Sequence, residues 1–380
     1  MQKLTYAVAT FSALLAAVPA QSKTVTATAA NFTSVYNTLV GGDKLVLSGT
    51  FAGVSVSNKV FASKVTIDAR AATFTSLVRV MNVNNITWMG GKFLIPDTGV
   101  HYTKAITVST ATNIVFTGLS IVGHDTGQGV QIGSGKNISI LNSRFERLRV
   151  GVAMQGVTGG TISGNISRAS SNDGFDIADS HKIKVTHNTC SGTAPSVGAH
   201  ADCVQLWSIK GNVPNSDIMI ADNTATGATQ GFTSFNGSAG GGDRISFLRN
   251  RVDTSYPQGI ACYECRDSNI SNNVVTTQSG AQFRTSINVV GGARNTVAGN
   301  TVGAKPITGA NSVVADDAAF DRADFTDIST VNLDPTRAVT GGGIGIAAAV
   351  PEPQTWATML AGFALAGAAM RRRRIAVVTG

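Results

Sequence analysis

The chain has 380 residues, of which 42 are glycine and only 14% are charged. Its hydrophobic fraction of 43% excludes a disordered chain, and Val, Ile and Thr alternate with Asn, Ser and Gly, as in β proteins with many tight turns. The formal charge of +8 falls to about +4 without residues 1–20 and 350–380, and no Lys/Arg run in the body indicates a nucleic-acid partner.

The N-terminal residues 1–20 have the pattern of a secretory signal peptide. Lys3 precedes an apolar run, which ends in the small-residue site Val18-Pro19-Ala20. We therefore expect cleavage after Ala20 and a body domain over residues 21–310.

A short amphipathic helix is predicted near the start of the body. Its apolar residues follow the i, i+3, i+4, i+7, i+8 pattern, and Gly41 comes next as a stop: Phe32, Val35, Tyr36, Leu39 and Val40. Such a helix would cover the open first coil of a stacked β protein.

A repeat of short β-rich stretches, each ending in asparagine, runs through the body. The asparagines are 23 to 35 residues apart and stand at positions 142, 165, 188, 223, 250, 273 and 300. Weaker copies precede them at KVTID, NITWMG and NIVFTG. This period, without helix-length patterns, predicts an all-β solenoid of about ten coils, in which the asparagines stack and adopt the left-handed αL conformation at a bend.

A second strand of each coil can be aligned in frames of six residues. The frames begin at Gln128, Val150, Asp173, Asp202, Gln230, Gln258 and Thr285. Every third member is apolar, and so are nearly all fifth members, which predicts that both columns point into the core. The fourth members, including Asp176 and Gln205, are then expected to point outward.

These repeats resemble the right-handed parallel β-helix proteins of the pectate-lyase-like superfamily, over residues 24–310. The resemblance implies the fold. It leaves the activity open, because that fold hosts lyases, hydrolases, epimerases, esterases, tailspikes and adhesins.

Acidic residues occupy matching positions on two successive coils. Asp173 and Asp202 are first in their frames, and Asp176 and Gln205 are fourth. Because neighbouring coils lie about 4.8 Å apart, all four are expected to cluster on one outer face. His200 stands two residues before Asp202.

This cluster suits chemistry on an acidic polysaccharide. In uronate β-elimination or C5 epimerisation, His200 is the expected base, and Arg149 or a cation held by the aspartates neutralises the sugar carboxylate. Calcium is a possible cofactor, although no spacing matches a known calcium loop. The alternatives are a glycoside hydrolase and a non-catalytic surface protein that binds exopolysaccharide.

Two segments are similar to polygalacturonase-like hydrolases. NDGFDI (residues 172–177) and ADCV (residues 201–204) match two motifs of that family. The resemblance implies that Asp173 and Asp202 are two of three catalytic acids. The third position holds Ala201, which cannot act as an acid.

Three aromatic residues fall at the sixth, outward position of successive frames: Trp207, Phe235 and Tyr263. Exposed aromatic rings stack on sugars, so this column is a candidate substrate-binding surface unless a loop covers it.

The chain contains four cysteines: Cys190, Cys203, Cys262 and Cys265. Export makes disulfides possible, and three connectivities are open. A Cys190–Cys203 bond would close a loop, and the CxxC pair is expected to form a disulfide or two buried thiols.

The C-terminal segments have a different composition. Residues 311–349 are predicted to be a cap and a linker. In residues 350–374, Pro351-Glu352-Pro353, an apolar span and four arginines follow one another, which resembles the PEP-CTERM sorting signal. The resemblance implies export, a transmembrane segment before processing, exosortase cleavage and a Gram-negative cell envelope.

Overall fold

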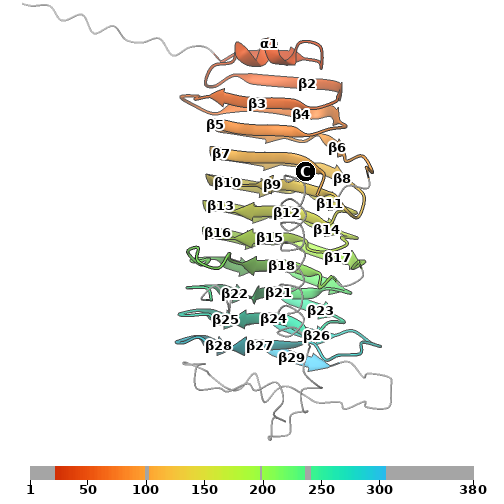
Figure 1. The fold of residues 1–380 in the computed structure, drawn as a ribbon, viewed down its shortest axis with the longest axis vertical. Coiled ribbons are helices and arrows are strands. Elements are labelled where there is room, and N and C mark those ends of the chain that lie inside the picture. The colour runs from red at the N-terminus through yellow and green to blue at the C-terminus, as the bar shows by residue number, and fades with distance from the viewer. Residues whose placement is uncertain (1–21, 99–101, 197–198, 236–240, 305–380) are drawn as a thin grey trace, which may run out of the picture.

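The protein is a parallel β-helix, described by a computed structural model over residues 22–98, 102–196, 199–235 and 241–304 (Figure 1). The chain makes about 11 turns around the axis, and every strand pairing is parallel. The predicted all-β solenoid is confirmed. The predicted signal peptide, cap, linker and sorting signal lie outside the described residues. The last described strand ends at residue 304, within the predicted body domain.

Each coil contributes strands to three faces, which we call A, B and C. Four long strands run over two faces each, namely β2 (Lys44–Phe51) and β4 (Val65–Phe74) over B and C, and β5 (Val78–Met89) and β7 (Lys104–Thr117) over A and B.

Face A carries the aligned frames. Its other strands are β3 (Val54–Lys59), β9 (Gln128–Ile132), β12 (Val150–Gln155), β15 (Phe175–Ala178), β18 (Asp202–Trp207), β21 (Gln230–Phe235), β24 (Gln258–Tyr263) and β27 (Ser286–Val290).

Faces B and C complete each coil. Face B has β1 (Thr24–Ala27), β10 (Gly135–Leu141), β13 (Val157–Ser163), β16 (His181–Thr186), β19 (Met219–Ala221), β22 (Ser246–Leu248), β25 (Asn269–Ser271) and β28 (Thr296–Ala298). Face C has β6 (Lys92–Leu94), β8 (Ser120–Val122), β11 (Arg144–Glu146), β14 (Ile166–Arg168), β17 (Thr189–Thr193), β20 (Thr224–Gly227), β23 (Arg251–Thr254), β26 (Val274–Thr277) and β29 (Thr301–Ala304).

The frame alignment on face A is confirmed by the strand register. Phe175 pairs with Val204, and Asp176 pairs with Gln205. The third and fifth members of the frames are buried in the core, including Ser234, while Asp176 and Gln205 are partly exposed.

The single helix of the described residues, α1 (Phe32–Asn37), covers the first coil, as expected (Figure 1). Phe32 packs edge-on against Phe51, with ring centroids 6.4 Å apart. The helix ends before Leu39 and Val40, which the sequence pattern had included. The carboxylate of Asp43 accepts a hydrogen bond from the backbone N–H of Val40 at 2.9 Å, which stabilises a turn in place of a further helical turn.

A column of buried asparagines runs along the corner between faces B and C. It contains Asn165, Asn188, Asn223, Asn250, Asn273 and Asn300. Each side-chain amide donates to the side-chain oxygen of the next asparagine, for example at 3.0 Å from Asn188 to Asn223. The stacking prediction is confirmed for these six.

Two details of this prediction were wrong. Asn142 is exposed, and Ser143 takes the column position of its coil. The αL conformation belongs to the residue before each column asparagine, as at His187 (φ 57°) and Asp222 (φ 59°). The bend therefore comes one residue earlier, which turns the following side chain inward.

Replacement of Asn223 by alanine should lower the free energy of unfolding by roughly 2–4 kcal/mol, measured by denaturant titration. Its amide donates to Val185 O at 2.9 Å and to Asn250, and its oxygen accepts from Asn188, so three partners on the two neighbouring coils lose bonds. The exposed Asn269 is the matched control, and an equal loss in both alanine variants would contradict a special role of the column.

Candidate active site on face A

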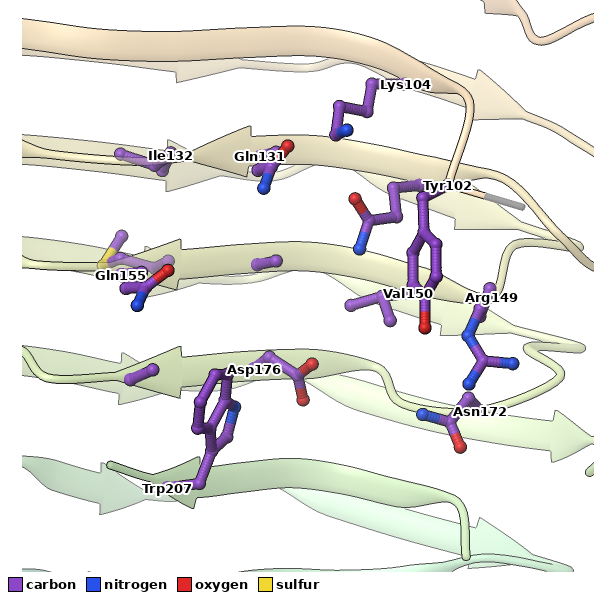
Figure 2. A pocket seen from close by; sticks show the side chains of 14 residues that line it. Tyr102, Lys104, Gln131, Ile132, Arg149, Val150, Gln155, Asn172, Asp176 and Trp207 are labelled. Carbon is purple, nitrogen blue, oxygen red and sulfur yellow. The ribbon is translucent and has the colours of Figure 1, made fainter. Parts of the chain in front are cut away.

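A groove of about 440 Å³ lies on face A, over the coils from β7 to β18 (Figure 2). Its lining includes Lys104, Tyr102 and Arg149, together with Asp176 and Trp207. The remaining polar lining includes Gln128, Gln131, Gln155 and Asn172. The groove thus combines two cations, one acid, an aromatic ring and several amides.

Asp176 is the acidic side chain that faces this groove. It is the fourth member of its frame, so β15 directs it outward. Figure 2 shows it between Trp207 on one side and Arg149 and Asn172 on the other. Its Oδ1 atom is buried and has no hydrogen-bond partner in the described structure.

Asp173 and Asp202 cluster with Asp176, but they are not on the surface as predicted: they are only 2% and 1% exposed. The backbone N–H of Asp202 donates to Asp173 Oδ1 at 2.8 Å, and the amide of Asn172 donates to its other oxygen. Both aspartates stand at the corner where the chain enters a strand, and neighbouring side chains of the corner cover them.

Asp202 is enclosed by hydrogen-bonding groups from its own coil and the next one. Thr233 donates its hydroxyl to Oδ1 at 2.8 Å, and His200 Nδ1 lies 3.1 Å from Oδ2. The side chain of Asp202 has no solvent exposure, and that of His200 is 28% exposed.

Burial raises the pKa of all three carboxyl groups. For Asp176 the pKa rises to about 7, because burial and the charge of Asp202 outweigh the opposing effects of Asp173, His200 and Arg149. The pKa of Asp173 is raised well above its usual value by burial and by the neighbouring charges of Asp176 and Asp202. Asp176 is therefore near its midpoint at neutral pH, as suits a general base.

Arg149 and Lys104 make the opposite part of the groove cationic. The guanidinium of Arg149 lies over the ring of Tyr102, with 5.2 Å from its central carbon to the ring centroid. Stacking orients the guanidinium while its charge stays available to an acidic ligand.

The predicted aromatic column is only partly in the groove. Trp207 lines it, whereas Phe235 and Tyr263 lie on the next two coils and contact each other edge-to-face at 5.2 Å. His200 packs edge-on against Phe235 at 6.3 Å, and neither His200 nor Gln205 lines the groove.

Several groove residues were not found from the sequence. Gln128 begins the first frame of the alignment but was not assigned to a site. Lys104 pairs with Gln128 and continues the first column of the frames toward the N-terminus, so an alignment extended by one coil would have placed it. Tyr102 lies in a loop outside the repeat and had no such signal.

Both cysteine pairs form disulfides, Cys190–Cys203 and Cys262–Cys265. The first joins β17 to β18 and closes the loop that carries His200. A side chain at Gly174 would meet Cys190 Sγ at 2.8 Å and Cys203 O at 2.7 Å, so only glycine fits above this bond. The disulfide and Gly174 together position the two coils that carry the acids.

Comparisons with known proteins agree with the fold and with the C-terminal motif. The family model described as periplasmic copper-binding protein (NosD) matches residues 63–214, less than half of the chain, and the PEP-CTERM protein-sorting motif matches residues 349–374. The chain is a parallel β-helix protein with a PEP-CTERM sorting motif. This motif indicates export to the cell envelope. No curated protein matches the sequence significantly.

Solved structures with a similar fold share little sequence with this β-helix protein. The alginate lyase from Paenibacillus sp. str. FPU-7 is 18% identical with a TM-score of 0.51, over 71% of this chain and 98% of its own. PfbA, a surface adhesin of Streptococcus pneumoniae, is 14% identical (TM-score 0.49, 70% and 85%). The A-module of the Azotobacter vinelandii mannuronan C-5 epimerase AlgE6 is 14% identical (TM-score 0.46, 75% and 91%). At such identities the likeness concerns the fold.

The described part of this β-helix protein contains no group of three or more His, Cys, Asp and Glu side chains placed to hold a metal ion, and its four cysteines are in disulfides. Within the same residues, no helix is long and apolar enough to cross a membrane.

Replacement of Asp176 by asparagine should stabilise the protein at alkaline pH. The folded-state pKa of Asp176 is raised from 3.8 to about 7, so its stabilising contribution is complete in acid and is lost as the pH rises through 7. At about pH 8 the free energy of unfolding of the variant should exceed that of the wild type by roughly 2 kcal/mol, and this difference should vanish near pH 4.

Asp222 is the matched control for this measurement. Its pKa is lowered by Arg249, which it contacts at 2.8 Å, so Asp222→Asn should lose a little stability above about pH 4. Destabilisation of the Asp176 variant at pH 8 would contradict the assigned environment of that carboxyl group.

Proposed function

We propose that this protein binds an acidic, uronate-containing polysaccharide in the face A groove and abstracts the C5 proton of one sugar, in a lyase or C5-epimerase reaction. One observation carries this proposal: a carboxyl group with a pKa of about 7, Asp176, faces a groove whose other polar part holds Lys104 and Arg149. The fold is also that of an alginate lyase, which is consistent with such a ligand.

The groove offers complementary groups to a uronate unit. Arg149 can bind the sugar carboxylate with two parallel hydrogen bonds, which withdraws electrons and makes the C5 proton more acidic. Gln128 is 8% exposed and its Oε1 has no partner in the described structure, so it suits a sugar hydroxyl donor. Trp207 provides a ring face for stacking.

In the lyase reaction, the Asp176 carboxylate takes the C5 proton. The C–H electron pair forms the C4=C5 double bond, and the C4–O bond breaks. Its electrons stay on the leaving oxygen, which takes the proton back from Asp176. Epimerisation begins with the same proton transfer, and C5 then regains a proton from the opposite face, so the products distinguish the two.

This assignment replaces His200 by Asp176 as the base, because His200 does not line the groove. A hydrolytic pair of Asp173 and Asp202 is less well supported. Both side chains are buried and hydrogen-bonded within the protein, and neither lines the groove in which a sugar would bind.

The sorting motif supports a second part of the proposal. After export through a signal peptide, the C-terminal segment would retain the chain in the membrane until an exosortase cleaves near Pro351-Glu352-Pro353, in a Gram-negative cell. The β-helix would then act on polysaccharide at the cell surface.

The direct test is incubation of the purified protein with alginate, polygalacturonate and a neutral glucan, with calcium and with a chelator. We expect ultraviolet absorbance of unsaturated uronates with an acidic polymer, or C5 inversion seen by NMR, in both metal conditions. Asp176→Asn should lower turnover at least 100-fold and retain binding. Reducing ends without absorbance would instead establish hydrolysis. The absence of reaction on every polymer would contradict the proposed catalysis and favour a protein that only binds polysaccharide.

Replacement of Arg149 by glutamine should weaken binding of the acidic polymer about ten-fold or more, because a charge-assisted contact is lost. Arg168, which lies on face C in β14, is the matched control. Affinity electrophoresis in gels containing the polymer measures the effect, and equal retardation of wild type and Arg149→Gln would exclude Arg149 from the binding site.

A further inference from the structure

The buried acids connect the groove to a histidine outside it. Asp176 faces the groove, the side chain of Asp202 has no solvent exposure and its charge acts on Asp176, and His200 Nδ1 lies 3.1 Å from Asp202 Oδ2. The ring of His200 packs against Phe235 on β21, one coil beyond β18, and its side chain is 28% exposed. His200 can therefore exchange protons with solvent without passing through the groove.

We propose that His200 is a positioning residue whose charge, transmitted through the buried carboxyl group of Asp202, sets whether Asp176 is ionised. The inference rests on the proposed role of Asp176. Nothing in the proposed reaction requires His200 to touch the substrate. His200 would therefore control the ionisation of Asp176 from outside the groove.

Several described residues face this pair. The coil of β15 presents Asp173 and Asp176 to Asp202, and from the next coil Thr233 donates to Asp202 and Gln230 pairs with it in register; both are uncharged. From the preceding coil, Arg149 acts on Asp176. Arginine is always charged, whereas histidine changes charge near neutral pH, so among these described residues His200 is the variable cation.

The direction of the effect follows from charge balance. An imidazolium at His200 neutralises the Asp202 carboxylate, and a second negative charge on Asp176 is then less costly. When the imidazole is neutral, the charge of Asp202 is uncompensated in a site with little water, and Asp176 retains its proton to higher pH. A rising pH thus removes the cation that favours the ionised base, which broadens the titration of Asp176.

The test is a carboxyl ¹³C NMR titration of Asp176 in the full protein, with Asp176→Asn to assign the signal. His200→Gln keeps a hydrogen-bond donor for Asp202 but no charge, and should raise the midpoint of Asp176 by about half a pH unit or more. His200→Arg supplies a permanent charge and should give a lower midpoint than His200→Gln. His181→Gln, on face B beside Ser216, is the matched control and should leave the midpoint unchanged.

Two results would overturn the inference: an unchanged midpoint in His200→Gln, or equal shifts in the Gln and Arg variants, which would indicate a packing effect alone. Because the titration does not require turnover, the absence of any reaction would count against the proposed function and leave this test intact. If the lyase or epimerase activity is found, its pH profile should move in the same direction as the midpoint.

Discussion

The register between successive coils is the constraint on which the other features depend. The ladder of backbone hydrogen bonds is reinforced by the asparagine column from Asn165 to Asn300, whose side chains bond to the coils on both sides. In a parallel ladder a slip of one residue would exchange the inner and outer side chains of a strand. Because the column holds the register, Asp176 stays on the outer side of β15, and Phe175 and Ile177 stay in the core.

Two groups of aspartate side chains among the described residues have pKa values that are shifted in opposite directions. Outside the groove, Asp217, Asp222 and Asp267 each contact an arginine of the next coil, and this neighbour lowers their pKa. Beneath the groove, no arginine ion pair is seen for Asp173 or Asp202 among the described residues, and burial raises their pKa. Elsewhere in the protein the corners carry Asp–Arg pairs or amide side chains, so carboxyl groups buried together without an arginine destabilise the fold, and this cost indicates a function.

Contacts around the buried carboxyl groups offset part of the free energy that their burial costs. The Cys190–Cys203 disulfide holds together the two strands between which the His200 loop runs, and Thr233 from the next coil satisfies one oxygen of Asp202. Cations then act on the acids from two directions, with Arg149 on the groove side and His200 beyond Asp202. In the proposed reaction and its proposed control by His200, this arrangement would separate the group that contacts the ligand from the group that responds to the pH of the surroundings.

The parallel β-helix, the capping helix, the inner columns of the frames and the C-terminal sorting motif could all be predicted from the amino-acid sequence, because each depends on local periodicity or composition. The sequence also predicted that Asp173, Asp176 and Asp202 cluster, since equal frame positions on adjacent coils must be neighbours. The packing of the coils, in contrast, determines that Asp173 and Asp202 are covered, that His200 lies outside the groove, and that Lys104 and Tyr102 complete it. The alternation of a strand does not extend into the corner where it begins, and the path of a loop depends on the coils against which it packs.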